Sequence, residues 1–398
     1  MAFSFGKKKH KEVVLIFDIG SASVGASFVM LSPKGPEVLY TKRSAMPIGE
    51  HLSSERILAS TSIILKELVT VIEKEWIEKS KALKIKSKHI KHVLCVFASP
   101  WFVSHTKTFH IKKEEPLLVT KKTIEDIVAK ERQEFEKTIS DSKYASAFDK
   151  NIELLEHKII QIKIEGYVTS NPYGKKAKDI ELSFFESFIS KQILQKFTEI
   201  IGQPFGKETI QFHTFSLASY SALNDLFPNE GTFLCMDITG EVTDISLVKN
   251  DVLLESMSFP SGRNFLIRTI MKKTNTNPEV ALSYTKMHTE KHIEPKIAVV
   301  VNEAVKNAKE EWLVYLNDAL GDTSKNAVLP RKIFVTVDSD VEPIFIDFLK
   351  SSTPPLSPIV INAKQLNSSV AIKKGVCPDP FISLEALFFN KIFFLNGK

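Results

Sequence analysis

The chain has 398 residues, of which 43% are hydrophobic and 25% are charged, as in a soluble globular protein. This length is too great for one compact core, so we expect two or more domains. A formal net charge of +6 allows contact with an anionic membrane surface but does not require nucleic acid, and we expect no nucleic-acid partner.

Cysteine usage and hydropathy indicate the cellular compartment in which we expect the protein. The three cysteines, at positions 95, 235 and 377, are too few and too scattered for a disulfide framework or a zinc site. No run of 18 apolar residues exists, so we expect no segment that spans a membrane. The first six residues lead into lysines instead of a long apolar run, so we expect no signal peptide and a cytoplasmic protein.

Residues 1–12 form a basic N-terminal segment. Two phenylalanines precede a cluster of lysines in this segment. One interpretation is a weak membrane anchor, with the aromatic rings entering the headgroup region and the lysines contacting anionic lipid. The other is a flexible, solubilising tail, and the sequence leaves both open.

The first expected unit of structure is a β-hairpin with a carboxylate at its bend. An apolar run ends on Asp18, a short turn follows with Gly20 and Ser21, and residues 24–29 are apolar again. Backbone N–H groups in such turns bind anions, and an aspartate there can hold Mg²⁺ through water. One such hairpin is a weak signal of a nucleotide site.

The rest of the first domain is expected at residues 13–107 and 206–230. Apolar residues at three-to-four spacing predict a helix from about residue 53 to residue 78, and residues 92–99 are typical of a buried strand. The segment 206–230 contains an apolar helix that we expect to lie close to the core.

Residues 108–205 differ in pattern and predict a self-contained α/β module of plausible domain size. We expect a charged helix from about residue 120, followed by strands at 158–165 and 180–188. A helix at 191–201 is expected to close the module.

A second hairpin of the same design begins the second domain, which we expect at residues 231–398. An apolar strand runs to Asp237, a turn contains Gly240, and Thr243 begins the returning strand. Two such hairpins that face each other can hold a nucleotide phosphate tail, so the pair is more specific than either one. The very apolar ending, residues 380–395, favours a buried helix over a membrane helix because apolar residues surround most of it.

These motifs resemble those of the actin-like ATPase superfamily, in particular the bacterial group of the cell-division protein FtsA and the pilus-assembly protein PilM. The sequence Asp18-Ile-Gly-Ser resembles the first phosphate motif, and Asp237-Ile-Thr-Gly-Glu-Val-Thr-Asp-Ile resembles the second. Residues 259–264 resemble the strand and glycine turn that follow, and residues 166–182 resemble the small domain of this group. The resemblance implies an α/β fold of two duplicated, ribonuclease H-like domains, with a small SHS2-type α/β domain inserted in the first.

The resemblance also implies ATP and Mg²⁺ as cofactors, with Asp18 and Asp237 holding the metal through water. The residues it implies as phosphate contacts are Asp18, Gly20, Ser21, Asp237, Gly240, Thr243 and Gly262. No catalytic residue is indicated by the sequence.

Five residues depart from the family pattern and predict a weakened or lost nucleotide site. Thr239 and Glu241 stand where glycines are usual, and Asp338, Ser339 and Asp340 replace the glycine turn that receives adenosine. A carboxylate ~4 Å from a phosphate is repelled by about 1 kcal/mol in water and roughly 4 kcal/mol at an intermediate dielectric. Glu241 is expected either to exert this repulsion or to point into solvent.

The leading functional hypothesis is an FtsA-like scaffold that lies on the inner face of the cell membrane, links a division filament to it and self-assembles. Its expected partner is a tubulin-like division protein. The alternative is a PilM-like component of a type IV pilus platform that binds a peptide of a membrane protein. A third hypothesis, an ATP-dependent small-molecule kinase, is disfavoured because the glycine loops are degraded and no P-loop occurs. At most a weak ATPase activity is expected.

Overall fold

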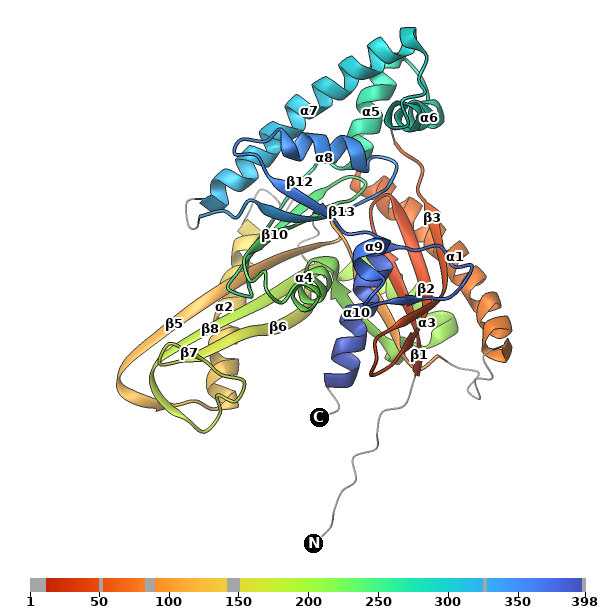
Figure 1. The fold of residues 1–398 in the computed structure, drawn as a ribbon. Coiled ribbons are helices and arrows are strands. Elements are labelled where there is room, and N and C mark those ends of the chain that lie inside the picture. The colour runs from red at the N-terminus through yellow and green to blue at the C-terminus, as the bar shows by residue number, and fades with distance from the viewer. Residues whose placement is uncertain (1–11, 50–52, 83–89, 142–150, 325–327, 396–398) are drawn as a thin grey trace.

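The computed structural model describes residues 12–49, 53–82, 90–141, 151–324 and 328–395, which form three β-sheets flanked by helices (Figure 1). The prediction of an anchor or a tail at the N-terminus concerns residues outside these ranges, apart from Glu12. None of the helices within them is long and apolar enough to cross a membrane.

The first sheet has the strand order β15-β3-β2-β1-β4-β9 and contains the first hairpin. Its strands are β1 (Glu12–Ile19), β2 (Ser23–Leu31), β3 (Glu37–Ala45), β4 (Val93–Phe97), β9 (Ile210–Thr214) and β15 (Ala371–Ile372). Strand β1 is antiparallel to β2 and parallel to β4, so it lies in the middle of the sheet.

Helices cover both faces of this sheet, which explains why β1 is apolar at successive positions. Leu15 and Phe17 lie in one buried cluster with α1 (Ser54–Ala82) and α3 (Lys191–Phe205). Val14 and Ile16 lie in another with α4 (Phe215–Leu226) and α10 (Pro380–Leu395). Successive side chains of a strand point to opposite faces, so a strand covered on both sides needs a continuous apolar run.

The second sheet has the order β12-β11-β10-β13-β14 and contains the second hairpin. Its strands are β10 (Phe233–Ile238), β11 (Thr243–Lys249), β12 (Val252–Phe259), β13 (Lys332–Val337) and β14 (Ser357–Val360). The helices of this half are α5 (Arg263–Thr274), α6 (Pro278–Thr289), α7 (Pro295–Ser324) and α8 (Glu342–Lys350), and the short α9 (Ala363–Leu366) follows β14. The fully buried Trp312 of α7 lies in the core of this half.

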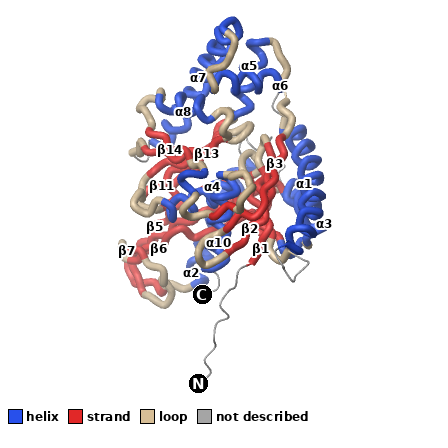
Figure 2. The backbone as a smooth tube through the Cα atoms, turned by 45° about the vertical axis from the view of Figure 1, so that its right-hand side comes forward, coloured by secondary structure: helices blue, strands red, loops and turns tan. Residues whose placement is uncertain are grey.

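The third sheet, with the order β5-β8-β6-β7, projects to one side of the first two (Figures 1 and 2). Its strands are β5 (Phe102–Leu118), β6 (Ile152–Ile164), β7 (Tyr167–Val168) and β8 (Lys176–Ser190), and α2 (Lys121–Asp141) packs on it. The sheet and α2 share a small buried cluster of their own. That this region is an independent inserted domain stays a prediction.

Two segments lie elsewhere than the sequence predicted. The helix expected to close the 108–205 module is α3, and its Phe197 and Ile201 pack with α1 against the first sheet. Residues 371–395, expected in the second domain, return to the first sheet, where β15 pairs with β3 and α10 packs on α4 (Figure 1). A helix that is apolar on most sides needs cover on more than one side, and the groove between α4 and β2 provides it.

The attachment of α10 to the first sheet predicts the effect of removing one of its rings. Phe389 is 1% exposed, so we expect Phe389→Ala to lower the free energy of unfolding by about 3–5 kcal/mol. Urea denaturation would measure the loss. Val299→Ala on α7 is the control, because Val299 is 69% exposed and its truncation should change stability by less than about 0.5 kcal/mol. Equal effects of the two changes would contradict the buried position of α10.

Candidate functional site

The two predicted aspartates lie at equivalent points of the two main sheets. Asp18 is near the end of β1, which is parallel to β4, and Asp237 is near the end of β10, which is parallel to β13. In α/β sheets, ligands bind beyond the carboxyl ends of parallel strands. Asp18 is 3% exposed and Asp237 is 7% exposed, so both carboxyl groups lie deep between the halves.

The turns of the two hairpins touch each other directly. Ser21 Oγ lies 3.3 Å from Thr239 Oγ1, and the backbone N–H of Glu241 donates to Ser21 Oγ at 2.9 Å. A Cβ atom on Gly240 would lie 2.3 Å from the Cβ atom of Ala22, so only glycine allows this approach. The N–H of Glu241, which lies in the predicted phosphate turn, is therefore already bonded to protein.

Gly20, Thr243 and Gly262, which are also predicted phosphate contacts, are engaged within the protein as well. The N–H of Gly20 donates to the carbonyl of Ser23 at 3.1 Å, and the hydroxyl of Thr243 donates to the carbonyl of Ser261 at 2.8 Å. A Cβ atom on Gly262 would lie 2.3 Å from the carbonyl oxygen of Thr239. The structure thus brings all the predicted residues together, but packs them on one another.

Arg43 on β3 is the site residue that the sequence analysis missed. Its Nη2 lies 2.7 Å from Asp18 Oδ2, and its Nε lies 2.8 Å from Asp379 Oδ2. Its Nη1 donates to Ser23 Oγ at 2.9 Å. We call Arg43 with its two carboxylates, Asp18 and Asp379, the Arg43 bridge. No local motif marks Arg43, because its partners lie 25 and 336 positions away in the chain.

Carboxyl groups outnumber the cations around this bridge. Both oxygens of Asp237 lack a hydrogen-bond partner among the described residues. Burial, with Asp244 and Asp18 nearby, raises the pKa of Asp237 well above its ordinary value. Burial also raises the pKa of Asp18, although Arg43 lowers it. On α10, burial and the proximity of Asp18 raise the pKa of Glu385 well above its ordinary value. Burial therefore favours the neutral form of these carboxyl groups.

Glu241 neither faces a phosphate position as a bare charge nor points into solvent, which corrects both expectations. It is 5% exposed, and its Oε2 lies 2.6 Å from Arg268 Nη2 on α5. Its Oε1 accepts from Asn264 Nδ2 at 2.8 Å and from Arg268 Nη1 at 3.0 Å. A buried carboxylate needs such partners, and α5 begins close enough to supply them.

The acids that replace the adenosine-binding glycines are paired with Arg263. Asp340 Oδ2 lies 2.5 Å from Arg263 Nη2, and Asp338 Oδ2 lies 3.5 Å from Arg263 Nε. Beside them is a cleft of about 380 Å³ whose lining includes Val337, Asp338, Ser339 and Phe381. The predicted adenosine position is thus next to an open cleft, but its backbone carries acidic side chains instead of glycines.

The residues present do not fit bound Mg²⁺ and ATP in this arrangement. The chamber between Asp18 and Asp237 measures about 30 Å³, whereas ligand pockets measure roughly 300–1,000 Å³. Within the part of the chain that the structure describes, no three or more His, Cys, Asp or Glu residues are grouped to hold a metal ion. The guanidinium of Arg43 already neutralises Asp18.

The paired hairpins and their flanking helices define the actin-like ATPase fold. No family model matches the chain, and no curated protein matches it in sequence. Among solved structures it is similar to a PilM–PilN type IV pilus biogenesis complex, with a TM-score of 0.62 and 13% identity over 96% of this chain and 98% of that one. This likeness shows the fold.

Two further solved structures are similar at lower scores. One is a protein of Bacteroides thetaiotaomicron with an actin-like ATPase fold and unknown function, with a TM-score of 0.38 and 14% identity over 98% of this chain and 99% of that one. The other is the ethanolamine utilization protein EutJ of Carboxydothermus hydrogenoformans, with a TM-score of 0.43 and 12% identity over 96% and 91% of the two chains.

The contact between the hairpin turns predicts that Gly240→Ala destabilises the protein. The new methyl group would overlap Ala22, and overpacking of this kind costs about 1–3 kcal/mol. Gly321→Ala on α7 is the matched control, because a Cβ atom there meets nothing within 4 Å and should stabilise the helix by about 0.5–1 kcal/mol. Chemical denaturation of both variants would measure the difference. A neutral Gly240→Ala would mean that the turns lie farther apart.

The raised pKa of Asp237 predicts a pH-dependent stability. The native state keeps this proton at pH values where the unfolded state has lost it, so stability falls as pH rises above about 4 towards the native pKa. The slope is about 1.4 kcal/mol per pH unit for one such group. We expect Asp237→Asn to be less pH-dependent than the wild type between pH 5 and pH 8, in urea denaturation at each pH. Asp18, Asp244, Asp338 and Arg43 face Asp237 in both proteins, so identical slopes would contradict the assignment.

Proposed function

We propose that the chain is a PilM-like component of an assembly platform on the inner face of the cell membrane, where it binds a short segment of a membrane-protein partner. The observation that carries the proposal is the fold that the chain shares, over almost the full length of both chains, with the PilM–PilN type IV pilus biogenesis complex. In this proposal the protein is mainly a structural and interaction protein, with no nucleic-acid partner.

The apolar side chains of α10 are used in the core, so this helix is not the part of the chain that we propose to contact a membrane. Leu384 and Phe389 of α10 are buried against the first sheet, and Lys391 pairs with Asp225 at 2.9 Å. The FtsA-like scaffold is the second candidate. The closed chamber between the hairpins disfavours the small-molecule kinase, because a kinase needs room for ATP.

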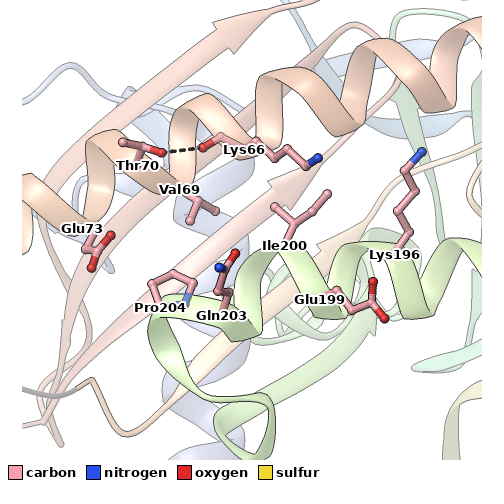
Figure 3. Close-up of a pocket in the computed structure, with 9 residues that line it drawn as sticks. All are labelled: Lys66, Val69, Thr70, Glu73, Lys196, Glu199, Ile200, Gln203 and Pro204. Carbon is pink, nitrogen blue, oxygen red and sulfur yellow. Dashed lines mark hydrogen bonds between the residues drawn. The ribbon is translucent and has the colours of Figure 1, made fainter.

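A groove of about 820 Å³ between α1 and α3 is the surface that we propose for the partner segment (Figure 3). Figure 3 shows Val69 and Ile200 facing each other between the two helices, with charged side chains around them. The residues Ile63, Lys66, Thr70, Glu73 and Ile77 recur at three-to-four spacing along one stripe of α1. Ile63 and Ile77, near the two ends of this stripe, are 58% and 54% exposed. Ile63 and Ile77 extend this stripe beyond the groove, whose own lining includes charged side chains, so we propose an amphipathic peptide with an apolar face on the stripe as occupant.

Site-specific photo-crosslinking of the full chain in its own cells tests this proposal. A photoreactive residue at Gln203, in the groove, should capture a pilus-platform membrane protein at least about tenfold more than one at the exposed Val299 of α7. Ile63→Asp with Ile77→Asp should abolish that crosslink, because both side chains are exposed and a charge there weakens apolar binding without disturbing the core.

The control for the paired change is Val314→Asp, at another exposed apolar position on α7. It should leave the crosslink unchanged. A tubulin-like division protein as the strongest product would overturn the pilus-type proposal in favour of the division scaffold. Equal capture at Val299 and at Gln203 would show that the groove is not the binding surface for the partner, in the pilus-type platform or in the division scaffold.

A further inference from the structure

The chamber between the hairpins is lined by a cation of the chain itself, the guanidinium of Arg43. The strand register explains how Arg43 reaches this position. Asp18 on β1 is paired with Gly25 on β2, and Gly25 is paired with Arg43 on β3. Residues at paired positions point to the same face of a sheet. A Cβ atom on Gly25 would lie 2.9 Å from Arg43 Nη2. Because Gly25 has no side chain, the guanidinium has room to cross β2 and reach Asp18.

Each nitrogen of the guanidinium is bonded to a group of the protein, although the side chain is 25% exposed and lines the cleft of about 380 Å³. Nε, Nη1 and Nη2 each have a partner, in Asp379, Ser23 and Asp18 respectively. The ring of Phe381, at the start of α10, lies 5.3 Å from the guanidinium carbon, within the range of a cation–π interaction. Because the planar guanidinium contacts two carboxylates, a hydroxyl group and an aromatic ring at once, it has few other conformations available.

We propose that Arg43 takes the place of a divalent cation in this fold and keeps the chamber between the hairpin turns closed without a nucleotide. Asp18 is a residue that the phosphate motif assigns to the metal, and Arg43 occupies its Oδ2. With that charge neutralised, the two turns meet, and the N–H of Glu241 bonds to Ser21 instead of to an anion. The inference does not depend on which partner the platform binds.

The Arg43 bridge also connects the chamber between the hairpins to helix α10. Asp379 accepts from Arg43 through Oδ2 and from the backbone N–H of Ile382, in the first turn of α10, through Oδ1 at 3.1 Å. Displacement of Arg43 by a metal ion would therefore disturb the start of α10 as well as the first hairpin. The closed state is thus built from three distant parts of the chain, at residues 18, 43 and 379.

The first arm of the test uses the wild-type chain with ATP and Mg²⁺ together, and with Mg²⁺ alone. A ligand at about 100 times its Kd raises Tm by several degrees. We expect no rise in Tm with either probe at about 1 mM, a concentration at which Kd values up to roughly 10 µM would be detected. A rise of several degrees with ATP and Mg²⁺ would overturn the proposal.

The second arm compares variants by hydrogen exchange of residues 238–243, which contain the amide bonded to Ser21. Arg43→Ala should speed this exchange at least about tenfold, because the loss of one partner leaves buried carboxylates uncompensated. Mg²⁺ alone should slow it again in this variant and not in the wild type, since Asp18 and Asp379 are then free to attract a divalent ion. A residue with only a packing role would not produce this dependence on Mg²⁺.

Three further variants keep the second arm interpretable. Arg43→Lys should exchange at an intermediate rate, because one ammonium group cannot span both carboxylates. If Arg43→Ala does not fold, Asp379→Asn removes one arm of the bridge and should still speed exchange. Arg331→Ala changes an exposed arginine and should match the wild type. Wild-type exchange in both Arg43→Ala and Asp379→Asn would overturn the proposal.

Discussion

The contact of Arg43 with Asp18 and Asp379 is the constraint on which the rest of the site depends. It requires β3 beside β2, a glycine at position 25 between the two side chains, and a C-terminal helix that begins at the same edge of the sheet. It also removes the charge of Asp18 from the space where the hairpins meet. The turns approach until Ala22 and Gly240 are in contact, which leaves a chamber of about 30 Å³.

Features that depend on residues close together in the sequence could be predicted, whereas contacts between distant residues could not. The two hairpins were predictable because an apolar run, an acid, a turn and a second apolar run all lie within about 16 residues of chain. The burial of α10 was predictable from its composition, although its place on the first sheet was not. Arg43 escaped detection because no local motif surrounds it on its strand and its partners are distant in the chain. The partner of Glu241 was missed for the same reason, since Arg268 lies 27 residues away on α5.

The acidic departures from the glycine motifs each have a cationic partner in the structure. Glu241 is paired with Arg268, and Asp340 is paired with Arg263. Each of these two arginines binds its carboxylate through two nitrogen atoms, which is the strong form of such an interaction. Loss of a nucleotide site by random decay would leave unpaired acids. The pairing indicates instead that the acidic residues at the motif positions are compensated by arginines of the chain, whereas Asp237 is left without a hydrogen-bond partner among the described residues.

This network has an energetic consequence for any nucleotide. Entry of a phosphate tail would require the hairpins to part, which exposes the Arg43 bridge and breaks the Ser21–Glu241 hydrogen bond. A hydrogen bond of this kind contributes about 0.5–1.5 kcal/mol. Binding at a Kd between 1 mM and 1 µM supplies about 4–8 kcal/mol in total. Loss of the Ser21–Glu241 hydrogen bond would therefore take up a part of the binding free energy of a nucleotide, and loss of the contact between Ala22 and Gly240 would add to it.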